Sequence, residues 1–129
     1  MLLVSLAHEA NVRIDAIPGP SAITAAFSIS GIMGNKFSFL GFAPQKKGRQ
    51  TFFEAINNRE EPVIFYESPH RILKTLEALA VVCGGKKVTI AREITKMHEE
   101  IVSDSAQGVL EYFKEHTDHV RGEFVVIVH

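Results

Sequence analysis

Apolar residues follow two periods along this chain. In some segments they recur every three to four positions, which is typical of amphipathic helices. In others they alternate with polar residues or form short unbroken runs, which is typical of strands. The two kinds of segment alternate from end to end, and this predicts a layered α/β or α+β fold rather than an all-α or all-β one.

The pattern predicts strands over 12–17, 37–42, 62–67, 87–93, 99–105 and 123–128. The strands over 87–93 and 99–105 are separated by about one turn, so we expect them to form an antiparallel pair. The segment 123–128 is apolar at both odd and even positions. That pattern predicts a central strand covered on both faces.

Helices are expected between these strands, over 2–10, 20–30, 49–58, 69–83 and 105–116. The last has a clean apolar stripe, with Asp104 or Ser105 as its N-cap. In the helix over 69–83, the spacing places Arg71, Lys74 and Thr75 on the face opposite the apolar stripe.

The charge and composition exclude several classes of protein. The formal net charge is −1 and the pI about 6.6, so any binding to nucleic acid must come from a local patch. The single cysteine, Cys83, excludes an internal disulfide framework and fits a reducing compartment such as the cytoplasm. No apolar run reaches the roughly 18 residues that span a bilayer, so no membrane association is predicted.

Two proline-containing turns are candidate ligand sites. In "IPGPSA", Pro20 stands where a first helical residue is favoured, and the free N–H groups after it can hold a carboxylate or a phosphate. In "FYESPHR", Ser68 is a candidate N-cap and Pro69 a candidate first residue, which places His70 and Arg71 in the first turn, where the helix dipole disfavours positive charge. A plain strand-to-helix turn is the alternative for both.

Ionisable residues follow two other strands. Arg92 and Glu93 come directly after the apolar run "VTIA", at the end of a strand, where α/β sheets usually hold ligands. The residues 98–100 after them fit a solvated loop. The loop after 37–42 is basic and can contact phosphates, although such loops also occur on proteins without RNA ligands. His116 and His119 have no further ligand nearby in the sequence, so no metal site is predicted, and Cys83 is expected to be a buried thiol.

Five separated motifs together point to a family. They are "PGPSAITAAFSISG", "FLGFAPQKKGR", "IFYESPHRILKTLEAL", "IAREITKMHEE" and "RGEFVVIV". In order and approximate spacing the chain resembles the bacterial small-subunit ribosomal RNA (cytidine-2′-O)-methyltransferases of the tetrapyrrole (corrin/porphyrin) methylase superfamily. The resemblance implies a SAM-dependent methyltransferase with cofactor and RNA in a cleft between two domains.

The family's fold implies a domain division. The chain resembles the C-terminal domain, a mixed five-stranded sheet flanked by helices. Residues 1–17 are then a remnant helix and strand of a missing N-terminal domain, and 18–129 form the C-terminal methylase domain. Without that domain the chain is expected to be inactive.

The resemblance also implies roles for individual residues. The residues expected to contact S-adenosylmethionine are Pro20, Ser21, Ala22, Tyr66, Glu67 and Ala91. The candidates for taking or steering the hydroxyl proton are Glu67, His70, Glu93 and Lys96. The candidates for holding RNA phosphate are Lys46, Lys47, Arg49, Arg71 and Arg92. No metal is required.

Two other functions stay open on the sequence alone. One is a tetrapyrrole C-methyltransferase on the same fold, against which "FYESPHR" and the basic loop argue. The other is a non-catalytic module for dimerisation or RNA docking. Family members tend to be homodimers, and a missing covering domain would leave apolar surface exposed near residues 12–30.

Overall fold

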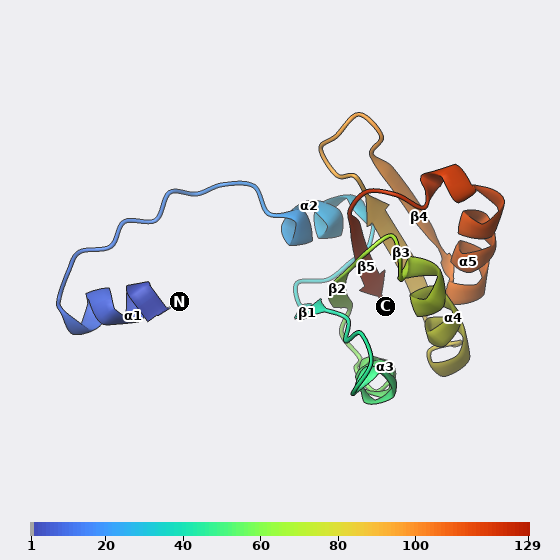
Figure 1. Cartoon of the computed structure of the whole chain (residues 1–129), viewed down its shortest axis with the longest axis horizontal. Coiled ribbons are helices and arrows are strands. Elements are labelled where there is room, and N and C mark those ends of the chain that lie inside the picture. Colours follow the sequence, from blue (N-terminus) through green and yellow to red (C-terminus); the bar gives the residue numbers. More distant parts are fainter. Residues whose placement is uncertain (1) are drawn as a thin grey trace.

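The computed structural model describes residues 2–129 (Figure 1). The helices are α1 (Leu2–Glu9), α2 (Ala22–Ile29), α3 (Arg49–Asn57), α4 (Ile72–Val82), α5 (Ala106–Glu115) and a 3₁₀ turn η1 (Thr117–His119). The strands are β1 (Ser38–Phe42), β2 (Val63–Glu67), β3 (Lys87–Arg92), β4 (Glu100–Ser105) and β5 (Phe124–Val128). No helix in this range is long and apolar enough to cross a membrane.

The five strands form one mixed sheet in the order β1-β2-β5-β3-β4. Strands β1 and β2 are parallel, and the other neighbouring pairs are antiparallel. The last strand in sequence, β5, therefore lies in the middle, and all five of its residues are buried. The predicted fold class, the antiparallel β3–β4 pair and the central β5 are confirmed.

The two faces of the sheet are covered unequally. Helices α3, α4 and α5 cover one face and bury the larger apolar core, which includes Phe53, Phe65 and Phe113 (Figure 1). The other face packs on α2 through a smaller cluster that includes Ala26 and Ile64. Successive residues of a strand point to opposite faces of the sheet. At the end of each strand, one side chain therefore faces α3, α4 and α5, and the next faces the α2 side.

The amphipathic helix α5 is as predicted. Ser105 is its N-cap, and the Ser105 side chain accepts a hydrogen bond from the Gly108 amide at 3.1 Å. The buried residues of this helix are Ala106, Val109, Leu110 and Phe113. These are the residues of the apolar stripe.

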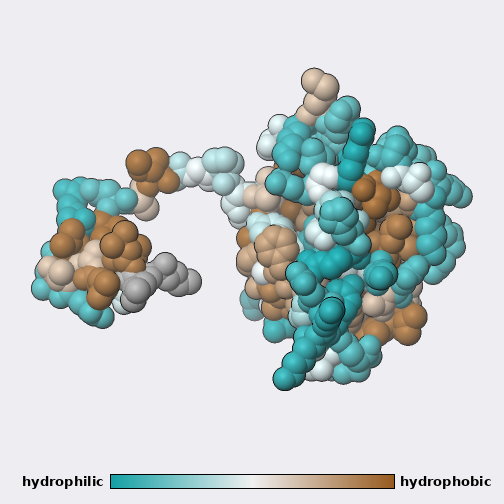
Figure 2. Space-filling model, in the orientation of Figure 1, coloured by the Kyte–Doolittle hydropathy of each residue, from teal (hydrophilic) through white to brown (hydrophobic). Residues whose placement is uncertain are grey.

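The segment before α2 differs from the prediction. Residues 12–17 form no strand; they are extended and exposed, and connect α1 to the body of the molecule (Figure 1). A strand needs a partner for its backbone hydrogen bonds, and none of the five strands pairs with this segment. Apolar side chains are exposed here and on α1, including Leu3, Ile14 and Ile17, and hydrophobic atoms are prominent on this part of the surface (Figure 2).

Both proline-started helices begin later than predicted. Ser21 is the N-cap of α2, and the first helical hydrogen bond runs from the Ala25 amide to the Ser21 carbonyl, so Pro20 precedes the helix. Ser68 does not cap α4. The amides of Arg71 and Ile72 both donate to the Ser68 carbonyl, which makes a separate turn before α4 starts.

Candidate active site

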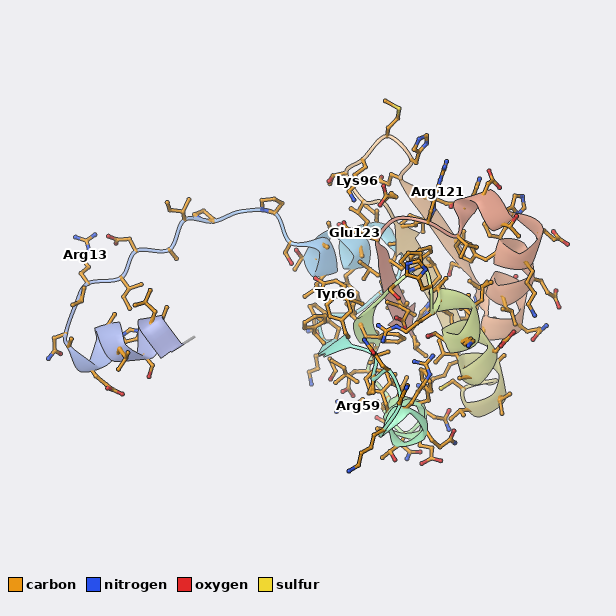
Figure 3. All side chains as sticks on the ribbon, viewed as in Figure 1. Arg13, Arg59, Tyr66, Lys96, Arg121 and Glu123 are labelled. Carbon is orange, nitrogen blue, oxygen red and sulfur yellow. The ribbon has the colours of Figure 1, made fainter. Side chains whose placement is uncertain are left out.

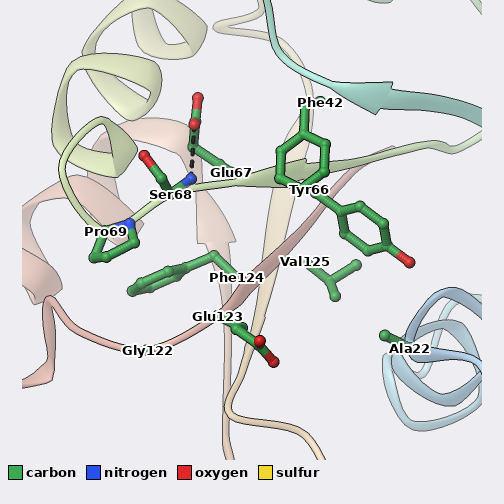
Figure 4. A pocket seen from close by; sticks show the side chains of 10 residues that line it. All are labelled: Ala22, Phe42, Tyr66, Glu67, Ser68, Pro69, Gly122, Glu123, Phe124 and Val125. Atoms are coloured by element: carbon green, nitrogen blue, oxygen red, sulfur yellow. Dashed lines mark hydrogen bonds between the residues drawn. The ribbon is translucent and has the colours of Figure 1, made fainter.

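A pocket of about 430 Å³ opens where β1 and β2 end and β5 begins (Figure 4). Its lining residues are Ala22, Phe42, Tyr66, Glu67, Ser68, Pro69, Gly122, Glu123, Phe124 and Val125. The antiparallel register places Tyr66 opposite Val125 and Glu67 opposite Phe124. One wall of the pocket is thus the end of β2 with its following turn, and the other is the start of β5.

The pocket is mainly apolar with a polar rim. The rings of Phe42 and Tyr66 line it, with their centroids 5.3 Å apart. Ser68 and the exposed Glu123 supply polar groups. Aromatic faces attract cations, and a carboxylate adds negative charge, so the site favours a small ligand that is apolar in part and positively charged in part.

The carboxylate of Glu67 is buried on the helical side of β2, away from Tyr66 (Figure 4). Its Oε1 accepts hydrogen bonds from the Ser68 amide at 2.7 Å and from Arg71 Nη2 at 2.8 Å. Its Oε2 accepts one from the Thr75 hydroxyl at 2.6 Å and lies 3.8 Å from Arg49 Nη1. These partners hold the turn that forms one wall of the pocket.

Thr75 is buried, which contradicts the prediction that it lies on the polar face of α4. Its hydroxyl donates to Glu67 and accepts a bond from Arg49 Nη2 at 2.7 Å. A buried hydroxyl is tolerated when it is hydrogen-bonded, and the Thr75 hydroxyl acts here both as a donor and as an acceptor.

The opposite wall of the pocket is held by a second charged cluster. Glu93 Oε1 accepts hydrogen bonds from the Glu123 amide at 2.9 Å and from Lys96 Nζ at 3.0 Å. Lys96 also contacts Glu123 Oε2 at 2.9 Å, at the same end of the sheet (Figure 3). Buried Arg92 donates to the Arg121 carbonyl at 3.4 Å and to Glu100 Oε2 at 2.8 Å. Arg92 and Glu93 therefore fix both sides of Gly122.

The pKa values in this cluster are shifted by its hydrogen bonds. The Glu123 amide, followed by Lys96, lowers the pKa of Glu93. Hydrogen bonds to Glu123 and then to Glu93 raise the pKa of Lys96. The lowered pKa makes Glu93 a weaker base, and the raised pKa keeps Lys96 protonated at neutral pH, so neither group readily accepts a proton. These surroundings favour a positioning role for Glu93 and Lys96, and their predicted role as bases stays a prediction.

Replacing Glu93 by glutamine is expected to destabilise the protein at neutral pH and progressively less in acid. Because the folded state lowers the pKa of Glu93, its stabilising effect is complete above the pKa of the unfolded chain and is lost as the pH falls through the folded-state value. Urea unfolding of wild type and Glu93→Gln at several pH values between 7 and 3 measures the difference. Glu60→Gln, at an exposed glutamate, is the control. A difference that does not change with pH would contradict the expectation.

The predicted cofactor contacts are partly brought together. Ala22, Tyr66 and Glu67 line the pocket, and Ser21 is adjacent to Ala22. Ala91 is buried in the same apolar cluster as Ala26 of α2 and is not a lining residue. Ala22, next to Ser21, and the end of β2 therefore border one pocket, whereas the Glu67 carboxylate itself points to the sheet face opposite α2.

The remaining predicted residues separate into an exposed and an internal set. His70, Lys46 and Lys47 are exposed. The guanidinium groups of Arg49, Arg71 and Arg92 contact carboxylates within the protein. That these lysines and arginines bind RNA phosphate stays a prediction. Lys46 and Lys47 are the more accessible cations among them.

Cys83 and His119, both considered from the sequence, lie outside the pocket. Cys83 is a buried thiol, as expected, and burial raises its pKa. His119 Nδ1 lies 3.0 Å from Glu100 Oε1, in a network that also contains Tyr112. Within residues 2–129 no group of three or more potential metal-binding side chains is present.

Sequence reasoning missed Phe42 and residues 122–125 as pocket residues. The sequence did contain an indication that residues 122–125 lie at a site. The polar run "RGE" precedes a strand that is apolar on both faces, so it marks a strand terminus in the middle of the sheet. Its partner could not be identified without the strand order.

The family model for tetrapyrrole (corrin/porphyrin) methylases matches residues 1–109. That range includes α2, the end of β1 and the β2 terminus, which contribute to the pocket, but not the wall formed by residues 122–125. The chain belongs to the tetrapyrrole methylases.

Among similar members of the family, one from Escherichia coli O157:H7 is 39% identical over 128 residues, which is 98% of this chain and 45% of that protein. One from Thermotoga maritima is 36% identical over 112 residues, 87% of this chain and 50% of that protein. Both are named "Ribosomal RNA small subunit methyltransferase I". The chain spans about half the length of these relatives, and the resemblance inferred from the motifs is confirmed.

Solved structures of other tetrapyrrole methylases share the fold. The methyltransferase CobJ matches 98% of this chain and 54% of its own, with a TM-score of 0.64 and 21% identity. The uroporphyrin-III C-methyl transferase of Thermus thermophilus, complexed with S-adenyl homocysteine, matches 97% of this chain and 56% of its own, with a TM-score of 0.56 and 13% identity.

Proposed function

We propose that this chain is the substrate-side half of an S-adenosylmethionine-dependent methyltransferase that modifies the ribose 2′-oxygen of a cytidine in small-subunit ribosomal RNA. The observation that carries the proposal is the convergence of separate family motifs on one pocket. "PGPSA" supplies Ala22, "FYESP" supplies residues 66–69, and "RGEFV" supplies residues 122–125. The names of the relatives at 36% to 39% identity support the RNA substrate.

The pocket fits the proposed cofactor. Its volume of about 430 Å³ lies within the range of about 300–1,000 Å³ that is common for small-molecule sites. The ring of Tyr66 suits a sulfonium cation, and Ser68 and Glu123 suit the polar groups of the ligand. When bound, S-adenosylmethionine supplies an electrophilic methyl group.

The residues of this chain contribute mainly by positioning. Methyl transfer needs the ribose oxygen in line with the methyl group, and correct alignment supplies much of the rate. The Glu67 cluster holds the 68–71 turn, and Glu93 with Lys96 holds the start of β5, so the two walls stay at a fixed separation. His70, exposed in the turn next to Pro69, is the candidate for accepting the hydroxyl proton.

The proposed partners follow from the length of the relatives. The part of the relatives that this chain does not match would form the other wall of the cleft and complete the cofactor site. The exposed apolar residues on α1 and the 12–17 segment are surfaces that such a part would cover. We propose a homodimeric, cytoplasmic enzyme as the complete form.

Methyl incorporation into small ribosomal subunits tests the function. We expect transfer from radiolabelled S-adenosylmethionine only when this chain is combined with the part of the Escherichia coli relative that it does not match. RNA mass spectrometry should locate the methyl group on a cytidine 2′-oxygen. Robust turnover by the chain alone would contradict the two-part site. Methylation of a porphyrinoid in place of RNA would instead support the tetrapyrrole alternative.

A further inference from the structure

A bulge in the edge strand β1 brings two phenylalanines to the same side. Phe39 is opposite Ile64 and Phe42 is opposite Tyr66, so β1 contains one residue more than β2 over this interval. Gly41, with φ +71, provides the required left-handed backbone. In a regular strand, residues three apart would point to opposite faces. Here the rings of Phe39 and Phe42 both contact Tyr66, at centroid distances of 5.1 and 5.3 Å.

This aromatic patch, formed by Phe39, Phe42 and Tyr66, is open to solvent. Phe42 is 65% exposed and Phe39 is 41% exposed. Phe42 and Tyr66 also line the pocket, so the patch continues from the pocket rim towards the outer edge of the sheet. The bulge points the large apolar side chain of Phe42 into solvent beside the pocket, so most of this ring is not used for packing in the core. This is the arrangement expected of a binding surface.

The segment that carries Phe39 and Phe42 is locally cationic, although the chain as a whole is slightly acidic. Residues 16–53 contain no aspartate or glutamate. Their cations are Lys36, Lys46, Lys47 and Arg49. The three lysines are exposed, with Lys36 before β1 and the other two in the loop after it. Positive charge at both ends of an aromatic surface complements a polyanion that carries flat, apolar groups.

We propose that Phe39 and Phe42 of the aromatic patch bind unpaired bases of single-stranded RNA, with Lys36, Lys46 and Lys47 contacting the adjacent phosphates. Stacking on aromatic side chains requires bases that are out of a duplex, because paired bases do not expose their faces. Binding beside the pocket would keep the target nucleotide near the methyl-transfer site. The inference rests on the proposed function, because it assigns a single-stranded region to the RNA substrate of that site.

Replacing Phe42 by leucine tests the patch while keeping an apolar side chain. Binding of a fluorescent, unstructured RNA oligonucleotide to the full chain is followed by anisotropy. We expect Phe42→Leu to weaken binding about tenfold, as for the loss of one stacked base. Phe37→Leu is the matched control, because Phe37 is 36% exposed next to the same strand but packs on Phe27 at 5.0 Å. Its affinity should stay within twofold of wild type.

An abasic oligonucleotide of the same length separates stacking from charge. We expect it to bind wild type and Phe42→Leu equally, and more weakly than the RNA with bases binds wild type. Lys46→Ala should weaken binding of both oligonucleotides and reduce the dependence of affinity on salt. Circular dichroism confirms that the variants are folded. Equal loss in Phe42→Leu and Phe37→Leu, equal binding of the two oligonucleotides to wild type, or no measurable RNA binding would each overturn the inference.

Failure of the inference is distinguishable from failure of the proposed function. If methyl transfer to ribosomal subunits is observed and Phe42→Leu binds RNA normally, only the inference fails. If RNA binds through the patch and the combined protein methylates no RNA, only the proposed function fails. Light scattering identifies a competing occupant: a wild-type dimer that Phe42→Leu converts to a monomer would show that a second copy covers the patch, and this too would overturn the inference.

Discussion

Replacing Glu67 by glutamine is expected to lower the free energy of unfolding by about 3 kcal/mol. The Glu67 carboxylate is fully buried and accepts hydrogen bonds from Arg71, Thr75 and the Ser68 amide. The uncharged amide would leave the guanidinium groups of Arg49 and Arg71 without their buried counter-charge. The substitution should therefore loosen the 68–71 turn and with it one wall of the pocket.

Urea unfolding followed by circular dichroism measures this loss. Asp15→Asn is the control, since Asp15 pairs with Arg13 at 3.0 Å with both side chains exposed, and such pairs contribute about 0–1 kcal/mol. The experiment also separates two roles for Glu67. A positioning residue produces an unstable variant, whereas a general base alone would produce a variant of wild-type stability without activity. Unchanged stability would contradict the positioning role.

Replacing Gly122 by alanine is expected to lower the free energy of unfolding by about 2 kcal/mol. Gly122 has a φ of +87, which L-residues rarely adopt. A Cβ there would lie 2.3 Å from Glu93 Oε1, so the Glu93 side chain would have to leave the Glu123 amide. The backbone at the start of β5 would shift, and ligand affinity in the pocket should fall with it.

A double-mutant cycle identifies the cause of this effect. In the background Glu93→Ala the clash is absent, so the added cost of Gly122→Ala should be smaller than in wild type. Gly85→Ala is the matched control, because a Cβ at Gly85 meets nothing within 4 Å and its backbone is not left-handed. Additive effects of Gly122→Ala and Glu93→Ala would show that contact with Glu93 is not responsible.

The parts of the fold that were predicted correctly have strong local patterns. The four apolar positions of α5 and its Ser105 cap define that helix without reference to the rest of the chain. The uninterrupted apolar run of β5 similarly predicts burial on both faces, and all five residues of this strand are buried. In each case the side-chain pattern and the final environment agree, so local sequence was sufficient.

Features that depend on distant partners were not predictable in the same way. Residues 12–17 alternate like a strand, yet they have no neighbouring strand to pair with. Thr75 is polar in sequence but buried, because Glu67 and Arg49 satisfy its hydroxyl. The motifs located the candidate site, whereas the direction of the Glu67 carboxylate and the contribution of Phe42 required the strand order and the β1 bulge.

The central place of β5 affects how this protein is made. Strands β1 and β2 emerge from the ribosome early and β3 and β4 follow, but the two pairs of strands are joined only through residues 124–128. Until those residues leave the exit tunnel, the growing chain carries two separate half-sheets with unpaired apolar edges, which are prone to aggregation. Productive folding of the sheet must therefore wait until residues 124–128 have left the exit tunnel, and chaperones that shield nascent chains should increase its yield.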